Sequence, residues 1–527
     1  MRRARCTILE GNTIVSPTTV PVHASSLPAS PAPPRRRLVA ALLLALAPFG
    51  ANAATIAVTS PDDTDSAVFG TCTLRQAIMS MDVGGLVAAC HKTGAGFGVD
   101  DTITFAESAL TGAMTPGTVT LADSADPNGG IGGTLLVTAP NLTIDGSAWR
   151  GSGAGQYADG VTIARPDGAT NRFGILRNSA PAGSRLALAG VAIRNGHALE
   201  PLCDGGREGG GICMEAADLS MSDCRISGNQ AAIGGGGIAS ATGSVTIERC
   251  TIDHNLAYLG GGIDAGSGTV TVTSSTIDAN GEWGTSHGGG VHAAGTLVVV
   301  DSTISGNNGK LGAGLDVAGT LSLTRSLVTG NQAYYSGGGL HVLAGAVVTI
   351  AASTIAGNFA RYVGGGVYAE GTLDAGNSTL AANAARDGGG IFLTATATLR
   401  LEHATLSLNA ANFTGGGVGG SGSATIEHSI VSANTAGTGA DIGAGVGWTG
   451  TTNLVSATSV DLGPLQDNGG PTQTMLPGSG SAAIDAIATA DCVQPTDQRG
   501  IARPQGAGCD IGAVEVASDG IFADGFE

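Results

Sequence analysis

The sequence predicts an all-β fold, a parallel β-solenoid, and three observations support this prediction. A segment of about 25 residues recurs nine times in the middle of the chain, and a fixed period of this length is typical of solenoids. Each repeat contains one asparagine, which is followed in eight cases by a glycine cluster and an aliphatic residue. The composition agrees, because 88 glycines and 4% aromatic residues suit narrow stacked strands.

The N-terminal residues 1–53 are typical of an upstream extension followed by an export signal. Three arginines at 35–37 precede the short apolar run 38–47, and an A-x-A sequence follows at 51–53. This order predicts a secretory signal and a mature chain that begins at Ala54. The run is too short to span a bilayer, and we expect no transmembrane segment in the mature chain.

Residues 54–185 lack the clean repeat and are expected to form the N-terminal cap and the first irregular coils. Strand-like runs occupy residues 55–59, 101–105, 134–138 and 141–145. Thr73 and Gln76 fit a helix capping box, and Leu74, Ala77, Ile78 and Met81 would share one helical face. An amphipathic helix beginning at Thr73 would cover the open end of the solenoid, where strand edges are otherwise unpaired.

The repeats fill residues 186–456, and each divides into a constant and a variable part. The distance from the last cluster glycine to the next asparagine is 17 to 19 residues, whereas the distance from asparagine to glycine varies from 7 to 10. The constant part is interpreted as the wound wall and the variable part as a protruding loop. Coils of this length with two or three short strands predict a right-handed parallel β-helix. About ten coils at ~4.8 Å each would give a rod of about 50 Å.

The repeated asparagine has a structural interpretation. Its amide can hydrogen-bond the turn backbone and the coils above and below, and it tolerates the left-handed backbone of a tight bend. We therefore expect a ladder formed by Asn229, Asn255, Asn280, Asn307, Asn331, Asn358, Asn383, Asn409 and Asn434.

Eight cysteines follow the signal, and their even number in an exported chain predicts disulfides, with free thiols as the alternative. They fall into four local pairs: Cys72/Cys90, Cys203/Cys213, Cys224/Cys250 and Cys492/Cys509. Cys224 and Cys250 occupy the same repeat position one coil apart. Adjacent coils lie ~4.8 Å apart and a disulfide needs Cα atoms roughly 4.4–6.8 Å apart, so this pair is the preferred disulfide.

Aromatic residues and a polar row mark one side of the repeats. Seven aromatic residues of the repeat region lie in the variable loops: Tyr258, Trp283, Tyr334, Tyr335, Phe359, Tyr362 and Phe413. A second set follows the aliphatic residue after each glycine cluster: Asp264, His292, Asp316, His341, Tyr368 and Phe392. Strand side chains alternate between faces, so the aliphatic residue points into the core and the second set is expected to point outward.

Three interpretations of this side remain open. The aromatic rings could stack on sugar rings, and Asp and His could bind hydroxyls, along a groove for an extended polymer. Alternatively, opposite charges on neighbouring strands pair and the rings stack on one another, which is purely structural. Alternating Asp and His could also hold a cation such as Ca²⁺, but no tight ligand cluster predicts a metal site.

An enzyme would need more than this row. Asp264 and Asp316 would lie two coils apart, about 9.6 Å, a separation compatible with an inverting glycosidase. A lyase would want Ca²⁺ and a basic residue; Lys310 and Arg361 are nearby but belong to no motif. The formal net charge of −18 disfavours nucleic acid and anionic membrane surfaces as partners, and mildly disfavours polyanionic polysaccharides. We expect a monomer that binds a polysaccharide or another cell-surface ligand.

Both ends of the repeat region carry a family resemblance. Residues 72–78, CTLRQAI, resemble the CSLREAI motif that opens many exported bacterial β-helix proteins, with Thr for Ser and Gln for Glu. Residues 462–472, LGPLQDNGGPT, resemble the choice-of-anchor Q domain, and residues 483–486, 497–500 and 510–515 continue this match. Ile487 stands where that domain has a glycine. This module is taken as residues 457–515, followed by a tail at 516–527.

The middle of the chain is similar to polymorphic outer-membrane-protein and pectin-lyase-like β-helices. Together the resemblances imply an exported protein on the surface of a Gram-negative bacterium, associated with the outer membrane and anchored or sorted through its C-terminal region. They imply no particular activity. The function predicted is an adhesin, or a carbohydrate-binding or scaffold protein, and the alternative is a polysaccharide hydrolase or lyase of pectin-lyase-like fold.

Overall fold

The computed structural model describes residues 53–63, 70–94, 96–98, 100–111, 117–123, 133–151, 158–199, 203 and 206–516. The chain divides into residues 1–49 and residues 50–527. The expected signal at 35–47 and the tail from residue 517 onward lie outside the described residues. All that follows concerns the second unit, which forms a right-handed parallel β-helix as the repeat predicted.

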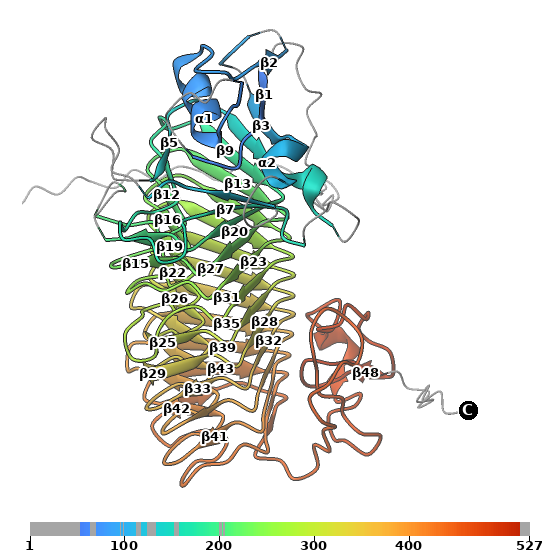
Figure 1. Ribbon diagram of the computed structural model, residues 1–527. Helices are drawn as coiled ribbons and strands as arrows, with labels where there is room; N and C mark the ends of the chain where they lie inside the picture. The colour runs from blue at the N-terminus through green and yellow to red at the C-terminus, as the bar shows by residue number, and fades with distance from the viewer. Residues whose placement is uncertain are drawn as a thin grey trace, which may run out of the picture. The chain divides into compact units, whose positions relative to one another are not determined.

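Each complete coil contributes one strand to each of three long sheets, which run the length of the solenoid (Figure 1). In the described residues the first sheet has 15 strands, parallel except for β2. Its members are β1 (Thr55–Val58), β2 (Lys92–Thr93), β3 (Asp101–Phe105), β6 (Leu142–Asp145), β9 (Arg185–Ala189), β13 (Asp218–Ser222), β17 (Val245–Glu248), β20 (Thr269–Thr273), β23 (Thr296–Val300), β27 (Thr320–Thr324), β31 (Val347–Ala351), β35 (Thr372–Gly376), β39 (Thr398–Glu402), β43 (Ser423–Glu427) and β45 (Gly447–Thr449).

The second sheet follows the first in each coil and has 13 strands in the described part of the chain. They are β4 (Thr118–Thr120), β7 (Val161–Ala164), β10 (Val191–Arg194), β14 (Arg225–Ser227), β18 (Thr251–Asp253), β21 (Thr276–Asp278), β24 (Thr303–Ser305), β28 (Leu327–Thr329), β32 (Thr354–Ala356), β36 (Thr379–Ala381), β40 (Thr405–Ser407), β44 (Ile430–Val431) and β46 (Leu454–Val455).

The third sheet follows each glycine cluster and has 11 strands among the described residues. They are β5 (Leu135–Val137), β8 (Leu176–Asn178), β12 (Ile212–Met214), β16 (Ile238–Ser240), β19 (Ile263–Ala265), β22 (Val291–Ala293), β26 (Leu315–Val317), β30 (Leu340–Val342), β34 (Val367–Ala369), β38 (Ile391–Leu393) and β42 (Val418–Gly420). Aliphatic side chains from all three sheets fill one continuous core along the solenoid.

The variable loops form short strands of their own. In the described residues, the loop sheet consists of β25 (Asn308–Leu311), β29 (Gln332–Ser336), β33 (Phe359–Ala360), β37 (Ala384–Ala385) and β41 (Ala410–Ala411). Earlier coils pair β11 (His197–Ala198) with β15 (Gln230–Ala231) in the same way. The loops protrude from the wall but are ordered strands that pair coil to coil.

The asparagine ladder is continuous from Asn229 to Asn434, and its side chains are buried. In each step, the Nδ2 and the backbone N–H of one asparagine both donate to the Oδ1 of the next, as Asn307 does to Asn331 at 2.9 and 3.0 Å. The ladder ends where Asn434 donates to the Asp441 carboxylate at 2.9 Å. Each asparagine thereby satisfies backbone groups that the turn between the second sheet and the loop leaves unpaired.

The N-terminal end carries the predicted helix. Helix α1 (Leu74–Val83) has Thr73 as its N-cap and a capping box with Gln76. The face that includes Leu74 and Ile78 is buried against β1, β3 and β5. Two shorter helices, α2 (Glu107–Thr111) and η1 (Ser147–Trp149), lie in the first coils. None of the helices in the described residues has the length and apolar character needed to cross a membrane.

Three of the four cysteine pairs form disulfides: Cys72–Cys90, Cys203–Cys213 and Cys492–Cys509. The prediction for Cys224 and Cys250 is wrong, because both are free, buried thiols. Their strand neighbours pair in parallel register, so the two side chains point the same way, and proximity of the coils alone does not direct one sulfur at the other.

The two thiols instead continue a ladder that serine hydroxyls form in later coils. The Cys224 N–H donates to the Cys250 Sγ at 3.3 Å, just as the Ser275 N–H donates to the Ser302 Oγ at 3.1 Å. Each sulfur also lies 3.2 Å from the carbonyl oxygen two residues earlier. Burial raises the pKa of the Cys224 thiol, which keeps it protonated as a donor.

The C-terminal module packs on the outer face of the second sheet (Figure 1, red). It contains β47 (Ile487–Ala488), the short helix η2 (Thr489–Asp491) and β48 (Gly508–Cys509). Buried Gln498 fastens it to two coils, since its Nε2 donates to Thr354 Oγ1 at 2.9 Å and its Oε1 accepts from Thr379 Oγ1 at 2.7 Å. The Ala513 N–H donates to Thr405 Oγ1 at 3.0 Å in the next coil.

We predict that acid destabilises this junction through His403, which the module covers. Burial, with the nearby charges of Arg503 and His428, lowers the pKa of His403 to about 3. The unfolded chain takes up a proton near the ordinary value of about 6.5. The folded state therefore loses about 1.4 kcal/mol per pH unit from this residue as the pH falls from 6.5 towards 3.

The test compares the wild type with His403→Gln by chemical denaturation at several pH values. Burial raises the pKa of Asp510 to about 6, and this carboxyl acts in the opposite direction between pH 6 and 4. The informative quantity is therefore the difference between the two proteins, which cancels Asp510. We expect His403→Gln to gain relative stability steadily on acidification, and a difference that does not change with pH would contradict a neutral buried histidine.

Candidate functional site

The polar row predicted from the repeats exists in the expected register. Asp264, His292, Asp316, His341, Tyr368 and Phe392 occupy neighbouring positions on six consecutive strands of the third sheet, from β19 to β38. The position read from the sequence in each coil therefore forms a single line along the third sheet, although a variable loop separates each strand from the next.

The expectation that this row faces solvent is wrong for three of its members. Asp264, Asp316 and His341 are 0, 2 and 4% exposed. Each glycine cluster folds back over the outer face of the third sheet. A Cβ at Gly234 would lie 2.3 Å from the Asp264 carboxylate, so a larger residue there would force this carboxylate to shift. The alternation of side chains along each strand correctly predicted that the row points away from the core. The glycine clusters, however, cover this outer face.

The buried charges of the row are matched in pairs. His292 Nδ1 lies 2.8 Å from Asp264 Oδ1, and Arg207 Nε lies 3.4 Å from the second Asp264 oxygen. His341 Nδ1 lies 2.7 Å from Asp316 Oδ1, and its Nε2 lies 3.2 Å from Glu370 Oε1. Burial alone would lower the pKa of His341, but the two carboxylates outweigh burial and raise it. Its imidazolium form is held between two acids, as expected for structural pairing.

Because of these contacts, the side chains of the row are poorly available for catalysis or metal binding. A glycosidase needs two carboxylates that reach the scissile bond, and Asp264 and Asp316 are covered and paired. Among the described residues, no group of three or more His, Cys, Asp or Glu side chains has an arrangement that could hold a metal ion. The last two members of the row, Tyr368 and Phe392, are partly exposed, and their rings stack with 5.9 Å between centroids.

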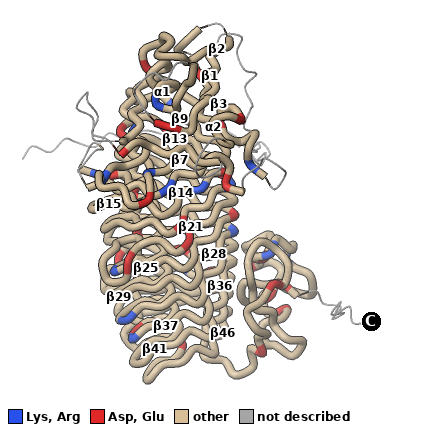
Figure 2. Tube along the Cα trace, viewed as in Figure 1, with Lys and Arg blue, Asp and Glu red and all other residues tan. Residues whose placement is uncertain are grey.

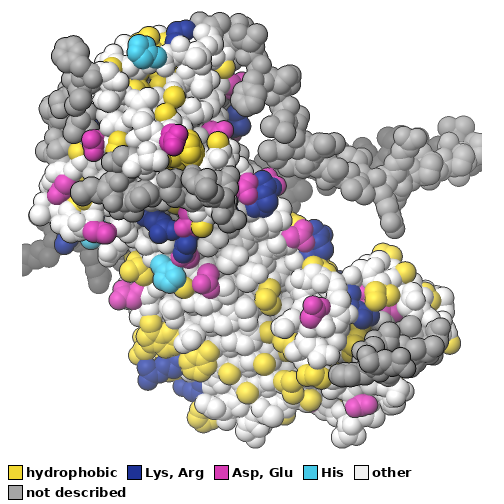
Figure 3. Space-filling model, turned by 45° about the vertical axis from the view of Figure 1, so that its right-hand side comes forward, with side chains coloured by type: hydrophobic (Ala, Val, Ile, Leu, Met, Phe, Trp, Pro, Cys, Tyr) yellow, Lys and Arg dark blue, Asp and Glu magenta, His cyan; other side chains and the backbone are white. Residues whose placement is uncertain are grey.

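A second set of residues forms a continuous exposed surface on the loops. We call it the aromatic strip and define it as Trp283, Lys310, Tyr334, Tyr335, Phe359, Arg361, Tyr362, Arg386 and Phe413. Trp283, Tyr335, Phe359 and Phe413 are 40, 42, 41 and 59% exposed. Hydrophobic and basic side chains lie beside one another at the left-hand edge of the lower half of the solenoid in Figure 3.

The loop sheet positions this strip. Small residues at one register position, among them Ala333 and Ala360, are buried beneath the loop strands and let the loops lie close to the wall. The residues that follow them point the other way, so Tyr334 and Arg361 project outward. A register shift between β25 and β29 gives the later loop an extra residue, which places Tyr334 and Tyr335 together on the strip.

The rings contact one another across coils. Trp283 stacks on Phe359 with 6.4 Å between centroids and meets Tyr334 edge to face at 5.8 Å. Tyr335 stacks on Tyr362 at 5.5 Å. Rings from three loops, within a span of four coils, therefore form one connected surface. Arg386 of the following coil links this surface to Phe413 one coil further on. The sequence had identified all the rings, and it had placed Lys310 and Arg361 nearby, but it gave no sign that basic residues join the rings.

Three cations lie on this surface. Arg361 Cζ is 4.9 Å from the Tyr334 centroid and 5.5 Å from the Tyr362 centroid, and Lys310 Nζ is 5.7 Å from the Tyr335 centroid. Arg386 lies 5.6 Å from both Tyr362 and Phe413. These distances are those of cation–π contacts. Figure 2 shows basic residues beside β25 and between β29 and β37.

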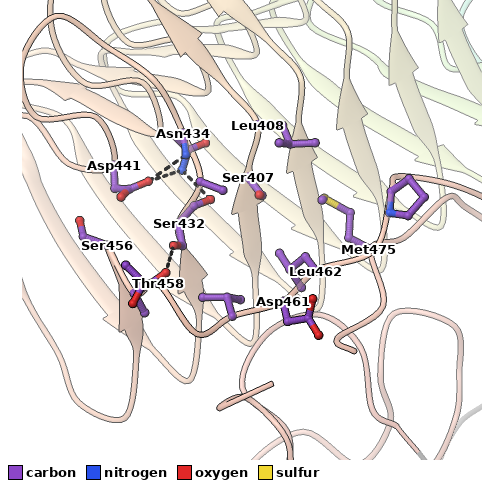
Figure 4. Close-up of a pocket in the computed structure, with 15 residues that line it drawn as sticks. Ser407, Leu408, Ser432, Asn434, Asp441, Ser456, Thr458, Asp461, Leu462 and Met475 are labelled. Carbon is purple, nitrogen blue, oxygen red and sulfur yellow. Dashed lines mark hydrogen bonds between the residues drawn. The ribbon is translucent and has the colours of Figure 1, made fainter. Parts of the chain in front are cut away.

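A cleft of about 510 Å³ lies elsewhere, between the last coils and the chain that leads into the C-terminal module. Figure 4 shows Asn434 and Asp441 directed at each other across its wall, which is the last step of the asparagine ladder. The Ser432 hydroxyl donates to the Ala457 carbonyl at 2.8 Å. The polar groups of this cleft that are named here hold the end of the solenoid together.

Comparison with known proteins adds to the fold and leaves the activity open. A family model described as a right-handed β-helix region matches residues 184–332. No curated protein and no solved structure matches the chain significantly. The matched residues run from β9 to the first residue of β29 and include Trp283 and Lys310 of the aromatic strip. The chain therefore contains a right-handed β-helix region.

Proposed function

We propose that this protein binds an extended polysaccharide along the aromatic strip, as an adhesin or scaffold without catalysis. The observation that carries the proposal is the connected surface of rings from Trp283 to Tyr362, which Arg386 links to Phe413. Aromatic faces are the side-chain surfaces that stack on the apolar faces of sugar rings. An exposed aromatic cluster of this size on a soluble fold is a marker of an interaction site.

The scaffold suits a long ligand better than a small one. The loops repeat at the spacing of the coils, about 4.8 Å, so the rings and cations of the strip follow one another along the solenoid axis. A polymer that lies along this axis can engage several coils at once, and each added contact becomes effectively intramolecular. The coil-to-coil pairing of the loop strands holds the rings in place before the ligand arrives, which reduces the entropy lost on binding.

We further propose that the protein is exported to the surface of a Gram-negative bacterium. The export signal, the CSLREAI-like motif and the choice-of-anchor Q-like module support this location. The three disulfides support it as well, because disulfides persist in oxidising compartments. In this proposal the C-terminal module serves anchoring or sorting, and the solenoid presents the aromatic strip to the outside.

We expect Trp283→Ala to weaken polysaccharide binding by about 5- to 10-fold, because it removes one stacking face worth roughly 1 kcal/mol or more. The measurement is affinity electrophoresis of residues 54–527 through gels that contain a panel of neutral and acidic polysaccharides. The matched control is Trp448→Ala, since Trp448 is equally exposed, at 42%, but lies on β45 outside the strip. Retardation by no polysaccharide, or equal effects of both substitutions, would refute binding at the strip.

A further inference from the structure

We infer that the ligand of the aromatic strip is an acidic polysaccharide whose sugars carry carboxylates. This inference rests on the proposed function and adds the chemical class of the polymer. It is drawn from Lys310 and Arg361, the two cations at the centre of the strip. In the described part of the chain, neither has a carboxylate within 4.0 Å, and both lie over tyrosine rings instead.

The absence of a partner stands out against the other arginines of the repeats, residues 186–456, each of which has a carboxylate within 4.0 Å. Arg225 pairs with Asp253, Arg249 with Asp223, and Arg325 with Asp301, in each case across adjacent coils. This solenoid therefore repeatedly places an acid opposite a surface arginine. The whole chain has 42 acidic and 24 basic residues, so carboxylates are abundant. Lys310 and Arg361 lack such a partner where the exposed rings gather.

The geometry of the two cations fits a carboxylated sugar chain. A guanidinium stacks on an aromatic face and still presents its N–H groups sideways to a carboxylate. Lys310 and Arg361 lie two coils apart, about 10 Å along the solenoid axis, so one extended polymer can meet both. Arg386 contributes less, because its Nε already lies 3.0 Å from Asp387 Oδ2. Stacking would hold the sugar rings, and the two free cations would select their acidic substituents.

The overall charge of the molecule makes the two cations of the strip more important for binding an acidic polymer. A net charge of −18 repels a polyanion at long range, so an acidic polymer gains nothing from the molecule as a whole. Binding must come from the local contacts of the strip. The affinity for an acidic polymer is therefore expected to depend strongly on two side chains, and little on arginines elsewhere.

The experiment uses one polymer in two forms, a uronic acid polysaccharide and the same polysaccharide after chemical reduction of its carboxylates. Dissociation constants for the mature chain are measured by isothermal titration calorimetry. We expect the carboxylated form to bind at least 10-fold more tightly than the reduced form. Lys310→Met and Arg361→Met should each lower this ratio several-fold, and the double variant should bring it close to one.

Arg325→Met is the control, because Arg325 is an exposed arginine paired with Asp301 away from the strip, and it should leave the ratio unchanged. Thermal unfolding of each variant confirms that the solenoid is intact. Equal binding of both forms by the wild type would overturn the inference and leave polysaccharide binding at the strip standing. Binding of neither form, nor of any neutral polysaccharide, would overturn the proposed function itself.

Discussion

Substitution of Asn331 by alanine is expected to destabilise the solenoid by about 3–4 kcal/mol. The change removes the Oδ1 that accepts both the backbone N–H and the Nδ2 of Asn307. It also removes the Nδ2 donor to the Ile304 carbonyl at 3.0 Å. The groups left behind are buried, and a buried polar group without a partner costs about 1–3 kcal/mol. Chemical denaturation followed by circular dichroism measures the loss.

Asn412→Ala serves as the control for this prediction, because Asn412 is an exposed loop residue. Its substitution should change stability by less than about 0.5 kcal/mol. A loss at Asn331 no greater than that at Asn412 would contradict the ladder as a source of stability. Coils contact mainly their neighbours, so a broken step in the middle of the ladder should also lower the cooperativity of unfolding.

Gly338→Ala is expected to destabilise the folded state by a comparable amount or more. A Cβ at this position would lie 2.4 Å from both the Gly365 and the Phe359 carbonyl oxygens. These are backbone atoms of the next coil, so they cannot move aside as a flexible side chain could. We expect a loss of about 3 kcal/mol or more, or failure to fold. Thermal unfolding and the yield of soluble protein report the outcome.

Gly480→Ala provides the matched comparison, since a Cβ at Gly480 meets nothing within 4 Å. Its melting temperature should remain within a few degrees of the wild type. Gly338→Ala should also weaken polysaccharide binding where the protein still folds, because its clash displaces Phe359 of the aromatic strip. A Gly338→Ala protein with unaltered stability would show that the coils are not held as closely as described.

The regular part of the fold could be predicted because one residue position repeats one physical role. The asparagine period predicted the buried ladder, and the position two residues past each glycine cluster predicted the register of β19 to β38. The capping box at Thr73 and Gln76 predicted where α1 begins. These predictions rest on local sequence and on the nearly constant length of the wall, and differences in loop length do not disturb either of them.

The features that were missed depend on contacts between segments. Asp264, Asp316 and His341 are covered by glycine clusters that fold over the third sheet, and strand alternation carries no information about what lies over the outer face. Cys224 and Cys250 are close in space, but the direction of parallel side chains decided against a disulfide. The packing of Gln498 against Thr354 joins residues 144 positions apart, and no repeat encodes it.

The aromatic strip could be predicted only in part. Its rings were recognisable because they fall in the variable loops and avoid the wall. The loop sheet, which turns these loops into a rigid surface, depends on short strands and small residues that carry little signal. Lys310 and Arg361 became significant only once their distances to the rings, and their lack of carboxylate partners among the described residues, were known.

Binding at the aromatic strip is tested most directly by the fluorescence of Trp283 during titration with a polysaccharide that retards the protein. The chain has three tryptophans, and only Trp283 belongs to the strip. We expect a saturable change in emission that is lost in Trp283→Phe, which keeps a stacking ring, and that persists in Trp448→Phe. Binding with the full emission change retained in Trp283→Phe would place the ligand elsewhere and contradict the proposed role of the strip.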